Sequence, residues 1–185
     1  KFLSEKILMN QFVTLEQIDR AVEAVRARAS RRPRIGIVLG SGLHSLADSV
    51  QQADFIPFGD LPDWPRSTVH GHTGRLVIGE LEGQSVMVMQ GRVHFYEGYS
   101  ISQVTLPTRV MARMGLEILI VTNAAGGVNP DFAPGDVMLI TDHLNLMGMT
   151  GANPLMGPNI EELGPRFPDM SQAYDLQLMA QARKT

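Results

Sequence analysis

Three short apolar runs, each ended by small or polar residues, constrain the fold of this chain most. "IGIVL" (35–39) is followed by "GSG", "SVMVM" (85–89) by "QGRVHFYEG", and "EILIVT" (117–122) by "NAAGG". Apolar runs without alternation are typical of strands that are buried on both faces. The ends of such strands meet in one crevice of an open α/β sheet, which is where ligands bind. The sequence therefore predicts an α/β fold with its site at these strand ends.

Two segments have helical periodicity, one before the first run and one between the second and the third. The first begins at Thr14, which forms the S/T-x-x-E/Q pattern of a capping box with Gln17. The second extends from Ser100, as its cap, to Gly115, as its stop. Pro107 lies inside it and should kink this helix or limit its first turn. Both helices are expected to cover the sheet.

The other expected elements complete a mixed sheet. "RLVIGEL" and "SVMVMQ" predict a hairpin, "VMLIT" (137–141) predicts a further strand, and "GSGLHSLADS" is expected to open a helix. A last helix is predicted after a Ser171 cap, with Leu176 and Met179 facing inward. Residues 1–185 are thus expected to form a single α/β domain, with a mixed central β-sheet flanked by helices.

Composition excludes several classes of function. The chain has no cysteine, which excludes disulfides, thiolate metal sites and a cysteine nucleophile and fits a reducing, cytoplasmic location. The net charge of −3 argues against a nucleic-acid or membrane partner. No run is long enough to span a bilayer, and the N-terminal patch does not read as a signal peptide. Because the chain starts at Lys1 and stops within a helical pattern, it is expected to be a piece of a longer protein.

The residues after the strands suggest an anion site. "GSG" presents main-chain N–H groups and the Ser41 hydroxyl, although a simple tight turn explains the two glycines equally well. Arg92 supplies a planar charged fork, and His94 follows two residues later. Glu97 is placed to pair with either of them. The alternative is an exposed salt-bridge cluster, but the surrounding glycines and aromatic residues favour a site.

Two other classes of site remain open. His70 and His72 form an H-x-H pair that, with His94 or His143, could make a metal-dependent hydrolase. The carboxylates of such a centre are not evident, so a role near phosphate is favoured for His72. A dinucleotide-binding domain is disfavoured because Ser45 occupies the position of the third fingerprint glycine.

Several motifs together resemble one family, the trimeric purine nucleoside phosphorylases. They are, in order, "GSGL", "STVHGHTGRL", "QGRVHFYEG", "VTNAAGG", "DHLN", "NPL", "GPN" and "RFPDMSQAYD". The resemblance covers nearly all of the chain after residue 30. It implies a nucleoside phosphorylase-like fold and the phosphorolysis of purine nucleosides to free base and pentose 1-phosphate. It implies no cofactor and no metal, with inorganic phosphate as a co-substrate.

The resemblance also assigns roles to residues. It implies a phosphate cradle with catalytic groups on Ser41, Arg92 and His94, completed by His72 and the main-chain N–H of Ala124. It places Tyr96, Asn123 and Phe167 at the nucleoside, with Phe167 reaching the site of a neighbouring subunit in a homotrimer. The family's purine-binding residues would lie beyond Thr185. A folded but inactive fragment of such an enzyme is therefore an alternative to an active one.

Overall fold

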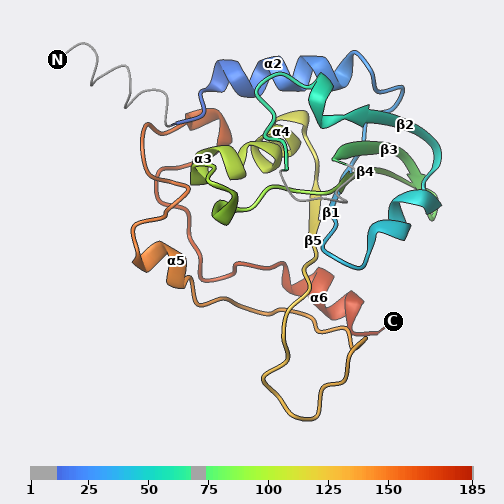
Figure 1. The fold of residues 1–185 in the computed structure, drawn as a ribbon, viewed down its shortest axis with the longest axis vertical. Helices are drawn as coiled ribbons and strands as arrows, with labels where there is room; N and C mark the ends of the chain where they lie inside the picture. The colour runs from blue at the N-terminus through green and yellow to red at the C-terminus, as the bar shows by residue number, and fades with distance from the viewer. Residues whose placement is uncertain (1–11, 68–73, 185) are drawn as a thin grey trace.

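The structure is a computed structural model that describes residues 12–67 and 74–184. Its centre is a five-stranded sheet in the order β2-β3-β4-β1-β5 (Figure 1). β1 lies parallel to β4 and β5, whereas β2 and β4 run antiparallel to β3. The mixed sheet and the hairpin expected from the sequence are confirmed. The strands are β1 (Ile35–Val38), β2 (Gln51–Pro57), β3 (Arg75–Leu81), β4 (Gln84–Gln90) and β5 (Ile118–Val121).

One face of the sheet is covered by helices α2 (Leu15–Arg26) and α4 (Leu106–Met114), which pack against each other. The Thr14 side chain accepts from the Gln17 N–H and the Gln17 side chain accepts in return, so the expected capping box is present. The stripe that α2 buries consists of Ile18, Ala21, Val22 and Val25. This apolar stripe fixes the helix on the sheet.

The second predicted helix is interrupted, as the sequence suggested. A short α3 (Ile101–Val104), capped by Ser100, precedes α4, in which Pro107 occupies the first turn. Proline has no N–H to donate, but an N–H in the first turn of a helix would have no partner within that helix, so Pro107 fits there. Gly115 ends α4 with a φ of 87°, a left-handed conformation that glycine adopts without strain.

The opposite face carries a smaller cluster, in which η1 (His44–Ser49) covers β1, β3 and β4. The helix expected in "GSGLHSLADS" is present, but as η1, a six-residue 3₁₀ helix that starts three residues after Ser41. It buries Ala47, and after Val50 the chain enters β2 at Gln51. Ser41 therefore does not lie at the N-terminus of an α-helix. Two further 3₁₀ turns are η2 (Phe58–Asp60) and η3 (Phe95–Glu97).

The segment after β5 differs from its prediction. Residues 137–141 do not form a strand, because no described strand lies beside them to pair with. The last helix, α6 (Leu176–Ala182), is capped by Asp175, while Ser171 donates to Asp169 in a separate turn. Met179 is half-buried, but Leu176 is mostly exposed and does not face inward.

Short elements make up the rest of this segment, namely α5 (Leu146–Met149) and η4 (Glu161–Leu163). Long irregular stretches connect these elements and carry the chain below the sheet in Figure 1. Within residues 12–67 and 74–184, no helix combines the length and apolarity needed to cross a bilayer.

Candidate functional site

The three predicted site segments lie side by side because β4, β1 and β5 are adjacent parallel strands. The main-chain bonds continue to the strand ends, where Leu39 N donates to Met89 O and Thr122 N donates to Val38 O. The chain then leaves the sheet at the carboxyl ends of these strands, in residues 40–42, 91–94 and 122–124. The expected convergence of these segments is confirmed.

Gly40 brings the first segment against the third. Its N–H donates to Thr122 Oγ1 at 2.8 Å. A Cβ on Gly40 would lie 2.6 Å from Asn123 Cα and 2.7 Å from Thr122 O, so only glycine permits this approach of the two backbones. The turn that carries the exposed Ser41 is thereby held beside the start of "NAAGG".

Arg92 joins the second segment to the third. Its guanidinium donates from Nη1 to Thr122 O at 2.8 Å, and its Nε lies 3.4 Å from His94 Nε2. The side chain is half-buried. A permanent positive charge is therefore fixed at the end of β5, one residue before Asn123, where an anion can reach it.

His94 is oriented by a buried carboxylate. Glu97 Oε1 accepts from the main-chain N of His94 at 2.8 Å and lies 3.2 Å from His94 Nδ1. The Glu97 side chain is only 2% exposed, and its other oxygen accepts from the Ser67 hydroxyl. A proton on Nδ1 is then shared with Glu97, which leaves Nε2 facing Arg92. Both ring nitrogens are thus engaged within the protein, which disfavours His94 as a metal ligand.

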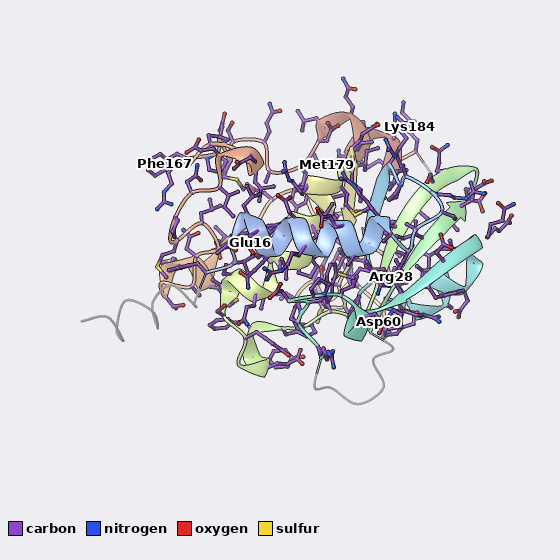
Figure 2. All side chains as sticks on the ribbon, turned by 90° about the horizontal axis from the view of Figure 1, so that it is seen from above. Glu16, Arg28, Asp60, Phe167, Met179 and Lys184 are labelled. Atoms are coloured by element: carbon purple, nitrogen blue, oxygen red, sulfur yellow. The ribbon has the colours of Figure 1, made fainter. Side chains whose placement is uncertain are left out.

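The residues expected at the nucleoside are open to solvent. Tyr96 is 75% exposed and stacks on His94, with ring centroids 4.8 Å apart and planes 13° from parallel. Asn123 is exposed, and its amide donates to Ala124 O. Phe167 is 88% exposed and lies at the outer edge of the molecule in Figure 2. Tyr96 and Asn123 therefore flank the charged groups, and Phe167 points away from the core.

The histidine pair of the metal hypothesis, His70 and His72, lies outside the described residues. The role near phosphate predicted for His72 therefore stays a prediction. In the part of the chain that the structure describes, no three His, Cys, Asp or Glu side chains are grouped to hold a metal ion. His143 lies 2.6 Å from the Tyr174 hydroxyl. It is therefore paired within the segment that follows β5.

Two polar residues of the site were missed by sequence reasoning. Gln90 is 4% exposed; its amide accepts from Arg75 Nε at 2.6 Å and donates to His44 O at 3.1 Å. Thr122 bonds to both neighbouring segments, as described above. The available signal was a polar side chain at the last position of an apolar strand, which has to find a partner when it is buried.

The fold and the site define a class, an α/β protein with a charged guanidinium fixed at the carboxyl ends of its parallel strands, where open α/β sheets bind their ligands. A sequence profile of the phosphorylase superfamily matches residues 34–185. The chain therefore belongs to the phosphorylase superfamily.

Curated relatives and solved structures show which members of this superfamily the chain is similar to. Purine nucleoside phosphorylase 1 of Geobacillus stearothermophilus is 55% identical over 90% of this chain and 60% of its own length. The Rattus norvegicus purine nucleoside phosphorylase is 50% identical over 94% and 60%. The Schistosoma mansoni enzyme in complex with inosine superposes with a TM-score of 0.87 at 43% identity, covering 94% of this chain and 60% of that one. The chain spans about 60% of the length of the curated relatives it matches.

Proposed function

We propose that this chain is part of a purine nucleoside phosphorylase, which cleaves purine nucleosides with inorganic phosphate. The observation that carries the proposal is the fixed Arg92 guanidinium, held between His94 and Thr122 O where three strand ends meet. The names of the 50–55% identical relatives support it, as does the binding of inosine by the Schistosoma mansoni structure.

The proposed reaction uses the site in a simple way. A phosphate oxygen forms a bond to the anomeric carbon of the sugar while the carbon–nitrogen bond to the purine breaks. The electron pair of that bond leaves with the purine, which takes up the proton that the hydrogen phosphate dianion loses, and the sugar becomes a 1-phosphate. Positive charge develops on the sugar as the bond breaks, so a phosphate dianion fixed beside it both stabilises that charge and captures it.

The roles of the residues follow from their contacts. Arg92 balances the charge of the phosphate and donates hydrogen bonds to it, and His94, oriented by Glu97, accepts from Arg92 Nε and lines the cradle beside it. Ser41 and the N–H of Ala124 complete the cradle from the adjacent segments. Tyr96 offers its exposed ring to the sugar. No cofactor enters this reaction, and phosphate is a co-substrate.

We also propose that Phe167 completes the sugar pocket of a neighbouring subunit in a homotrimer. An 88% exposed phenylalanine that points outward is available for such a contact. Complementation in the full-length protein tests it, because a Phe167→Ala subunit and an Arg92→Ala subunit refolded together form some pockets with both residues intact. Partial recovery of activity is expected. No recovery in demonstrated mixed trimers would place Phe167 in its own subunit's site. The cytoplasmic location stays a prediction.

The reaction is tested with two proteins. One is the 185-residue chain, and the other is this chain extended by the part of the Geobacillus stearothermophilus relative that follows the matched region. The extended protein should release hypoxanthine from inosine only when phosphate is present, and a chelator should have no effect. The 185-residue chain should release little or none, since the family's purine-binding residues are expected beyond Thr185. Release without phosphate, or release abolished by the chelator, would instead indicate a hydrolase.

Arg92→Ala in the extended protein separates phosphate binding from nucleoside binding. Loss of a charge-assisted contact should weaken phosphate by about 2 to 5 kcal/mol and leave the affinity for nucleoside almost unchanged. Arg92→Lys should restore only part of the loss, because an ammonium cannot donate as a planar fork. Saturation curves for the two substrates measure both effects. A change confined to nucleoside would refute the assignment of Arg92.

A further inference from the structure

Thr122 is bonded to two other segments of the site through all of its polar atoms. Its main-chain N and its hydroxyl both donate to Val38 O at 3.0 Å. The same hydroxyl accepts from Gly40 N at 2.8 Å. Its carbonyl accepts from Arg92 Nη1 at 2.8 Å. One half-buried residue therefore links the turn that carries Ser41, the Arg92 side chain and the start of "NAAGG".

The hydroxyl occupies the place of a main-chain carbonyl. In a continuing parallel ladder, Gly40 N–H would bond to a carbonyl of the neighbouring strand. β1 and β5 separate after Val38 and Val121, which are their last paired residues. Thr122 Oγ1 supplies the acceptor that the ladder no longer offers. Because its own carbonyl is free of the ladder, that carbonyl can accept from Arg92.

We propose that Thr122 is a positioning residue that sets the spacing of the phosphate cradle. It acts through Gly40 on Ser41 and directly on Arg92, and it touches no substrate. This inference rests on the proposed function, because it assumes that the cradle binds phosphate. Without the hydroxyl, the Gly40 N–H loses its acceptor and the Ser41 turn is no longer tied to the end of β5.

The chain offers a matched control in Thr105. The Thr105 hydroxyl is also half-buried and also bonded to main-chain carbonyls, those of Ile101 and Ser102. Both of these acceptors belong to α3, the helix directly before Thr105. Thr105→Val therefore removes the same hydroxyl without loosening one segment of the site from another.

The experiment is calorimetric titration of inorganic phosphate into the 185-residue chain and its variants. Thr122→Val keeps the shape of the side chain and should raise the Kd for phosphate about 5- to 30-fold, the range expected when a donor loses its acceptor. Thr122→Ser keeps the hydroxyl and should restore binding to within about threefold of the unaltered chain. Thr105→Val should leave the Kd unchanged.

Each other outcome decides against a specific statement. Equal Kd values for Thr122→Val and the unaltered chain, or equal weakening by Thr105→Val, would overturn the positioning role alone. No phosphate binding by the unaltered chain would overturn the cradle and this inference together. If Thr122→Val does not fold, amide hydrogen exchange on the unaltered chain decides: the Gly40 N–H should be protected before phosphate is added, and exchange at its free rate would overturn the inference.

Discussion

Residues 12–111 and residues 112–184 contain similar apolar runs but bury them differently. All of the buried apolar side chains that the structure describes lie between Val13 and Met111. In the second region, Val128, Val137 and Leu144 are at least 90% exposed. The first region has helices or turns on both faces of its strands, whereas the second, apart from β5 and a few short helices, consists of long irregular stretches, part of which lie below the sheet in Figure 1.

The comparison shows that an apolar run is not sufficient to define a buried strand. "SVMVM" is buried because β1 and β3 pair with it on either side and other elements cover its faces. "VMLIT" is similarly apolar, with four apolar residues and one hydroxyl residue, but lacks such neighbours among the described residues. Burial is a property of the assembled neighbours, and we expect the two regions to respond differently to the same substitution.

The largest difference is expected for leucine truncation. Leu76→Ala removes a fully buried side chain and should lower the free energy of unfolding by about 2 to 5 kcal/mol. Leu144→Ala removes a 90% exposed one and should change it by less than about 0.5 kcal/mol. Urea unfolding followed by circular dichroism measures both. Equal losses would mean that residues 112–184 share the cooperative core.

Glycine substitution tests how tightly the two regions are held together at Gly40. Gly40→Ala places a Cβ against the backbone of residues 122–123 and should cost about 1 to 3 kcal/mol, with loss of phosphate binding. Gly126→Ala meets open space and serves as the control. Thermal unfolding with and without phosphate reports both effects. A neutral Gly40→Ala would show that the two segments separate easily.

Helix caps give a smaller contrast. Thr14→Ala removes the cap of α2, which packs on the core, and should lower the free energy of global unfolding by about 1 kcal/mol. Asp175→Ala removes the cap of α6, which has no buried residue, and should reduce helix content without moving the global transition. If both variants shift the global midpoint equally, α6 unfolds together with the core.

Acid stability gives the smallest contrast. Ser30 donates its N–H and hydroxyl to Asp54, which lowers the pKa of that carboxyl, and Ser171 lowers the pKa of Asp169 in the same way. A lowered pKa stabilises the fold above the unfolded pKa of about 3.9, and this stability is lost as the pH falls through the folded pKa. Asp54→Asn should therefore be slightly less stable than the unaltered chain at pH 7, and the difference should vanish in acid.

Asp169→Asn is the matched control for this pH dependence. Its turn lies in the exposed region, so the variant should not change global unfolding at either pH. Urea midpoints between pH 7 and pH 3 provide the measurement. An equal effect of the two substitutions would place residues 169–171 in the same cooperative unit as β2.

The sequence predicted the elements that depend on local signals. The capping box at Thr14, the stop at Gly115 and the hairpin between β3 and β4 are set by residues close together in the chain. β2 was missed because its burial comes from pairing with β3, and most of its side chains are only partly covered. The prediction of a strand at 137–141 was wrong for the converse reason. The run is apolar, but whether distant residues pair with it cannot be read from the run itself.

For the site, the residues that follow the strands predicted that three segments would lie together. The hydrogen bonds that join these segments depend on contacts that the sequence does not display. Arg92 and His94 were recognisable by residue type and spacing. The role of Thr122 required knowing that Gly40 lies against it, 82 positions away in the chain. The His72 role stays a prediction, because this residue lies outside the described part.

β5 is one of the two edge strands of the described sheet, and this position has a consequence for the behaviour of the protein in solution. Leu119, Ile120 and Val121 are 43–59% exposed, beside backbone groups that face away from β1. An open apolar edge is a template on which a strand from another molecule can add. Self-association should therefore increase with protein concentration and with warming, and dilute, cold preparations should keep the molecules apart.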